Sequence, residues 1–126
     1  MSKAELTWRR APQSDDYRAA LSYLSLVYPM RHARQLVSKL RRAKTVTHAA
    51  KDLLRASNLP LLQRDDSHVG HDLQRIHKGK SISAVLLIQG DASQGLPLVV
   101  ADGYHRICAI CYYDEDAPVA CRIVSN

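Results

Sequence analysis

Apolar residues recur with a helical period through the first half of the chain. After Ser14 every third or fourth residue is apolar until Pro29, which predicts an amphipathic helix with the stripe Tyr17, Leu21, Leu24 and Tyr28. A second helix is predicted from Met30 to about Ala43, with the stripe Ala33, Leu36, Val37 and Leu40. Thr47 is expected to cap a third helix over residues 48–57, which Asn58 and Pro60 end.

The second half of the chain replaces the helical period with short apolar runs. A helix from His68 to about Lys78, capped by Asp66 or Ser67, leads into a predicted strand over Val85–Ile88. The turn-rich segment 90–96 connects it to a strand ending at Val100. The triplet 101–103 predicts a tight turn, followed by a helix over Tyr104–Tyr113 and a last strand that Pro118 opens and that ends at Val124.

These elements predict one small α/β (α+β) domain, a short mixed sheet with helices around it. A chain of 126 residues is long enough for a single core, and its 46% apolar content is ordinary for a globular protein. Residues 1–13 lack periodicity and are expected to be a loose tail, on which Trp8 is the residue expected to pack against the body. Residues 14–60 form a helical part expected to pack beside the core, which spans residues 68–124.

Composition narrows the class of protein further. No apolar stretch approaches the roughly 20 residues of a membrane span, and no secretory signal pattern opens the chain. Three cysteines, two of them (Cys108 and Cys111) in one predicted helix, fit reduced thiols better than a disulfide framework, so a cytoplasmic location is expected. Cys108, beside apolar Ile107 and Ala109, is expected to be buried. His68, His71 and Asp72 do not complete a known ligand pattern, and we predict no metal site made of protein ligands alone.

The net charge of +6 is concentrated in one segment. Between Arg31 and Arg55 there are eight basic residues and one acidic residue, Asp52. Two interpretations stay open for this segment. It is a solvated helix face, or it attracts nucleic acid through Arg34, Arg41 and Arg42.

The turn at residues 102–106, with the sequence D-G-Y-H-R, carries the strongest chemical signal. A glycine turn directly before a helix leaves the first backbone N–H groups of that helix pointing outward at the positive end of its dipole. His105 and Arg106 add donors to the same turn, which suits a phosphate. The alternative reading makes Asp102 an N-cap and Arg106 an ordinary surface charge.

The stretch from Leu98 to Ala109 resembles the second conserved box of the ParB/sulfiredoxin-like superfamily, and residues 72–88 resemble the first box. The resemblance implies that Gly103, His105 and Arg106 contact the phosphates of a nucleotide, which is ATP, ADP or CTP in relatives. Tyr104 would then stack on the base or line the pocket, and Mg²⁺ would arrive with the nucleotide. In sulfiredoxin the position of Tyr104 holds the catalytic cysteine, so sulfiredoxin chemistry is not implied.

Two functions therefore stay open at this point. The first is an enzyme that transfers or hydrolyses a phosphoryl group, in which Asp102 is a general base or a magnesium ligand and His105 stabilises charge or shuttles a proton. The second is a non-catalytic regulatory or nucleic-acid-binding protein that uses the basic segment 31–55.

Overall fold

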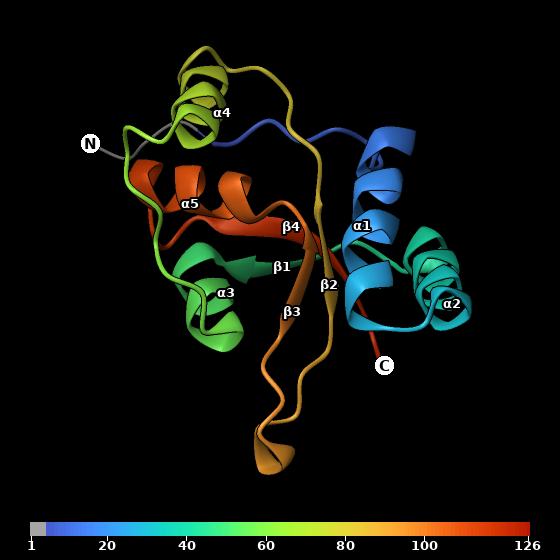
Figure 1. Cartoon of the computed structure of the whole chain (residues 1–126). Coiled ribbons are helices and arrows are strands. Elements are labelled where there is room, and N and C mark those ends of the chain that lie inside the picture. The colour runs from blue at the N-terminus through green and yellow to red at the C-terminus, as the bar shows by residue number, and fades with distance from the viewer. Residues whose placement is uncertain (1–4) are drawn as a thin grey trace.

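The computed structural model describes residues 5–126, and Figure 1 shows its helices and strands. In chain order the elements are α1 (Ser14–Val27), α2 (Met30–Arg42), β1 (Val46–Ala49), α3 (Ala50–Ser57), α4 (Ser67–His77), β2 (Val85–Ile88), the short 3₁₀ helix η1 (Ala92–Gln94), β3 (Val99–Asp102), α5 (Tyr104–Tyr113) and β4 (Pro118–Val124).

The four strands form one mixed sheet in the order β1-β4-β2-β3. The central pair, β2 and β4, runs parallel, with Val85 opposite Cys121. The outer strands β1 and β3 run antiparallel to β4 and β2, respectively. The prediction of a small α/β (α+β) fold with a mixed sheet is confirmed.

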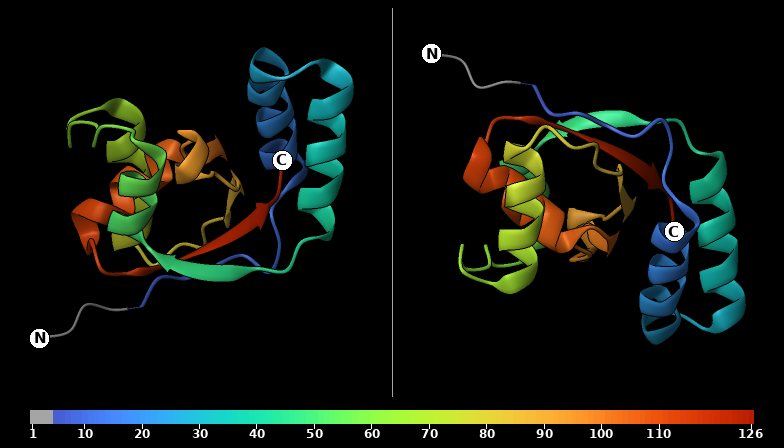
Figure 2. Two further views of the ribbon diagram at one scale, coloured as in Figure 1. Left: turned by 90° about the horizontal axis from the view of Figure 1, so that it is seen from below. Right: turned by 90° about the horizontal axis from the view of Figure 1, so that it is seen from above.

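Helices cover both faces of this sheet (Figure 2). All four residues of β2 are buried, and successive side chains point to opposite faces. Val85 and Leu87 join a core formed with α3, α4 and α5. Leu86 and Ile88 join a second core formed with α1 and α2.

Several predicted elements are confirmed with their bounds. The helix over Tyr104–Tyr113 and the strand over Val85–Ile88 occur as predicted. Asp66 caps α4, because its carboxylate accepts hydrogen bonds from the backbone N–H groups of His68 and Val69 at 2.9 and 3.1 Å.

No helix within residues 5–126 is long and apolar enough to cross a bilayer. Cys108 is fully buried, as expected.

The third helix begins later in the chain than residue 48, where it was predicted to begin. Val46–Ala49 is a strand that pairs with β4, and α3 begins only at Ala50, so Thr47 caps no helix. The β-branched pair Val46 and Thr47 favours a strand, but the partner that stabilises the strand lies about 70 residues away, beyond the reach of a local pattern.

The N-terminal segment is also more ordered than its lack of periodicity predicted. Ile82 donates a backbone hydrogen bond to Thr7 and accepts one from Arg9, at 2.9 and 2.8 Å. Trp8 packs against the core on the α4–α5 side, as expected for this residue. The prediction of a loose tail is therefore wrong for residues 7–9, while residues 1–4 lie outside the described part of the chain.

Hydrogen bonds from Arg122 link the α1–α2 pair to the sheet. From β4 its Nη1 donates to the hydroxyl of Tyr17 at 3.0 Å and to the backbone carbonyls of Leu40 and Arg41 at 3.3 and 3.0 Å. The last carbonyls of a helix lack partners within the helix, and this guanidinium donates to two of them at the end of α2. Leu40 O also accepts a hydrogen bond from Ala43 N–H at 3.3 Å.

Two leucines on α1 offer a matched test of the second core. Leu24 is fully buried and Leu26 is 86% exposed. We expect Leu24→Ala to lower the free energy of unfolding by about 2–5 kcal/mol through lost contacts and a cavity. Leu26→Ala should change it by less than about 0.5 kcal/mol. Urea unfolding followed by circular dichroism measures both, and equal effects of the two variants would contradict this packing.

Candidate functional site

The predicted turn is a single residue, Gly103. Its φ of 107° lies in the left-handed region, and it is the N-cap of α5. A Cβ here would lie 2.5 Å from Val85 Cγ1 and 3.0 Å from Arg106 Nη2, so the position has room for glycine only. Ile107 N–H donates to Gly103 O at 2.9 Å, and the preceding amides of α5 have no partner within the helix.

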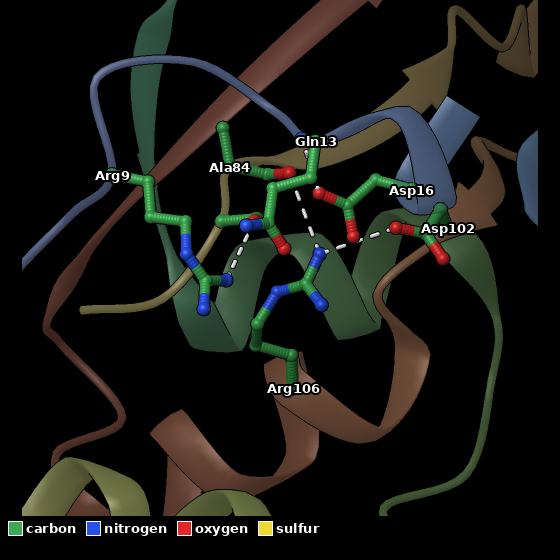
Figure 3. Close-up of polar contacts among 7 residues, drawn as sticks. Arg9, Gln13, Asp16, Ala84, Asp102 and Arg106 are labelled. Atoms are coloured by element: carbon green, nitrogen blue, oxygen red, sulfur yellow. Dashed lines mark hydrogen bonds and ion pairs between the residues drawn. The ribbon is translucent and has the colours of Figure 1, made fainter. Parts of the chain in front are cut away.

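Arg106 lies partly buried beneath this turn (Figure 3). Its side chain is 15% exposed, and Nη2 donates to Asp102 Oδ2 at 3.3 Å and to Ala84 O at 3.4 Å. Its Nε is buried and has no hydrogen-bond partner among the residues described. The reading of Arg106 as a surface charge is therefore wrong, because the first turn of α5 directs the side chain toward the start of β2.

Asp102 is the last residue of β3 and does not cap α5. Pairing with Leu86 extends β3 through Asp102, so Ala101 and Asp102 belong to the strand and not to the turn. The N-cap is Gly103, which makes no side-chain capping bond, and the N-cap reading of Asp102 is wrong. Its carboxylate, 16% exposed, forms the ion pair with Arg106 instead.

A second carboxylate reaches the same place from the first turn of α1. Figure 3 shows the side chain of Asp16 beside Asp102 and the Arg106 guanidinium. Gln13 N–H donates to Asp16 Oδ2 at 2.7 Å as part of the α1 capping box, which fixes this carboxylate. Asp16 was not among the site residues predicted from the sequence. The Gln13-x-x-Asp16 spacing signals a helix start, and only the packing of α1 against β3 brings it to the turn.

The crowding of these groups changes the acidity of Asp102. Burial raises the pKa of Asp102 above the usual 3.8, and the neighbouring Asp16 adds to the increase. The Arg106 guanidinium acts in the opposite direction but does not outweigh burial. Asp102 is therefore readier to take up a proton than a surface aspartate.

The remaining residues of the motif face a different side. The centroid of the His105 ring lies 4.8 Å from the ring centroid of His68 on α4 and 5.8 Å from the ring centroid of Tyr104. The Tyr104 hydroxyl donates to Pro60 O. The hydrogen bond from Val69 N–H lowers the pKa of Asp66, and the charges of His105 and His68 add to this effect. The structure thus joins Asp102, Gly103 and Arg106 on one side of the turn and sets Tyr104 and His105 toward α4.

The predicted nucleic-acid residues lie on α2, away from the turn. Arg34, Arg41 and Arg42 are all exposed. The Arg41 guanidinium lies 4.3 Å from the Tyr17 ring centroid, and Arg42 Nη1 donates to Ser38 Oγ at 2.9 Å. Across residues 5–126 no group of three or more His, Cys, Asp or Glu side chains is arranged to hold a metal ion.

Comparison of the chain with protein-family models, with curated proteins and with solved structures returns no match.

The raised pKa of Asp102 gives a pH dependence with a defined sign. The folded protein holds this proton more tightly than the unfolded chain, so the contribution of Asp102 to stability falls as the pH rises from the usual value near 3.8 through the folded-state pKa. Asp102→Asn removes this titration. We therefore expect the free energy of unfolding of the variant, relative to that of the wild type, to increase as the pH rises through this range.

Urea unfolding of both proteins at several pH values measures this difference. Asp16→Asn should reduce the pH dependence of the wild type, because the Asp16 carboxyl contributes to the raised pKa of Asp102. A stability difference that is constant or decreases with pH would contradict the assignment.

Proposed function

We propose that the turn at residues 102–106 binds the phosphate of a nucleotide, as its resemblance to the ParB/sulfiredoxin-like superfamily implies. The observation that carries this proposal is the Arg106 guanidinium, held beneath the start of α5 with a buried and unpartnered Nε. An unpaired guanidinium N–H beside the outward amides of a helix N-terminus is a favourable place for a phosphate oxygen.

The ion pair prepares Arg106 for this role. Asp102 and Ala84 O hold Nη2, so the side chain is oriented before a ligand arrives. An incoming phosphate competes with the Asp102 carboxylate for the guanidinium. If the turn only binds phosphate, the raised pKa of Asp102 favours its protonation, which would lower the repulsion between this carboxyl and the phosphate; catalysis would instead require the ionised carboxylate.

The same groups would also allow catalysis of phosphoryl transfer or hydrolysis at this turn. Asp102 would act as the general base of phosphoryl transfer or hydrolysis, and Asp16 supplies the second carboxylate that the motif itself lacks. One or two carboxylates together with substrate phosphates form the usual magnesium site, so Asp102 and Asp16 would hold Mg²⁺ that arrives with a nucleotide. His105, paired with His68, would donate to phosphate from the α4 side.

A titration with Arg106→Ala tests binding at the turn. We expect calorimetry of the wild type with ATP, ADP, CTP or GTP, with and without Mg²⁺, to show saturable binding. Arg106→Ala should weaken it about 10- to 100-fold, because a charge-assisted hydrogen bond is lost.

Arg75→Ala is the matched control, since Arg75 is also partly buried and its Nη2 donates to a carbonyl, Ser81 O, at 2.8 Å. This variant should bind like the wild type. Absence of binding by the wild type to every nucleotide, or equal losses in the two variants, would refute a phosphate site at this turn.

A nucleotide turnover assay distinguishes an enzyme from a protein that only binds nucleotide. If the turn is catalytic, phosphate release with Mg²⁺ should fall about 100-fold or more in Asp102→Asn, because general base catalysis is lost. The double variant Arg41→Gln, Arg42→Gln should keep full activity, since both residues lie on α2. A wild type that binds nucleotide without turning it over would assign the turn to binding alone.

A further inference from the structure

A long segment of the chain carries positive charge with no acidic residue to balance it. Residues 17–51 contain no Asp or Glu and eight Lys or Arg side chains, five of which lie on α2. Surface charges of both signs are usually interspersed. A segment of this length that holds only positive charges therefore produces a local positive electrostatic field.

The fold places this charge on one exposed face. The apolar stripe of α2 (Ala33, Leu36, Val37 and Leu40) is buried against α1 and β4. The opposite side of the helix is polar. Counted from Arg31, the residues at i+3, i+4, i+7 and i+11 lie on the same helix face, which is formed by Arg31, Arg34, Gln35, Ser38 and Arg42. Four of these are exposed and Ser38 is half-buried, and both views in Figure 2 place α2 at the periphery of the molecule.

The cations of α2 form no ion pair with any residue in the described part of the chain. The ion pairs among the described residues link Arg18 to Asp15, Lys51 to Asp116, Arg55 to Asp52 and Arg106 to Asp102, and none involves α2. Arg42 donates to the neutral Ser38 hydroxyl and Lys39 to the carbonyl of Ser125. Their positive charge therefore stays available to a partner.

A hollow lies beside the same face. A cavity of about 390 Å³ is lined by His32, Gln35, Leu36, Ser38, Lys39, Arg42 and Asn126. Arg41 lies on the other flank of the helix, over the Tyr17 ring, so the arginines of this face are Arg31, Arg34 and Arg42. Arg31 was absent from the residues predicted to contact nucleic acid.

We propose that this face of α2 binds the phosphate backbone of double-stranded DNA, independently of any ligand at the turn. Three exposed arginines on one helix face, without acidic partners among the described residues, are complementary to the closely spaced negative charges of a duplex. The 13 residues of α2 span about 20 Å, and a helix about 10–12 Å across fits a major groove about 12 Å wide.

Fluorescence anisotropy with a labelled 20-base-pair duplex tests the proposal between 50 and 200 mM salt. The wild type should bind, and its logarithmic affinity should fall linearly with the logarithm of salt concentration. The triple variant Arg31→Gln, Arg34→Gln, Arg42→Gln should bind at least about tenfold more weakly at 100 mM salt. Its salt slope should be smaller by nearly 3, about 0.9 for each lost phosphate contact.

The control removes the same amount of charge elsewhere. Arg55→Gln, Lys78→Gln, Lys80→Gln alters exposed residues of α3 and of the segment after α4, and should keep most of the affinity and the slope. Thermal melting and nucleotide titration of both triple variants verify that the fold and the turn are intact.

Three results would overturn the proposal. One is no binding of the duplex by the wild type at 50 mM salt. Another is an equal loss in the two triple variants, which would indicate net charge and not this face. The third is tighter binding to single-stranded RNA or to vesicles that contain phosphatidylserine than to the duplex.

Discussion

The burial of β2 on both faces is the constraint on which the rest of this fold depends. Its four apolar residues alternate between two cores, so the α1–α2 layer and the α3–α5 layer each obtain part of their interior from the same short strand. The start of β2 also forms the floor of the turn. Val85 leaves room only for glycine at position 103, and Ala84 O accepts a hydrogen bond from Arg106.

Packing two helical layers onto β2 brings charged groups together at the start of this strand. Arg106 from α5, Asp102 from β3 and Asp16 from α1 meet there, partly shielded from water. Burying ions is costly unless they are paired, and the unpartnered Nε indicates that the pairing is incomplete. This incomplete pairing at the start of a helix is the feature on which the proposed phosphate site rests.

Helix α1 connects the two surfaces for which we propose functions. Asp16 faces the turn, while the next residue, Tyr17, supports α2, since its ring lies under Arg41 and its hydroxyl accepts a hydrogen bond from Arg122. The two surfaces differ in electrostatics. The turn balances its guanidinium with carboxylates, whereas α2 presents cations without acidic partners, which suits a large polyanion better than a single phosphate.

The sequence by itself determined the features that depend on neighbours along the chain. These are the periods of α1, α2 and α5, the glycine turn and the basic character of α2. For the cap of α4 the sequence left Asp66 and Ser67 open, and the structure shows Asp66. Only the tertiary structure decided that Val46–Ala49 pairs as a strand, that Arg106 is partly buried, and that Asp16 joins Asp102. These features depend on contacts between residues far apart in the chain, and local periodicity carries no information about which distant segment will supply the partner.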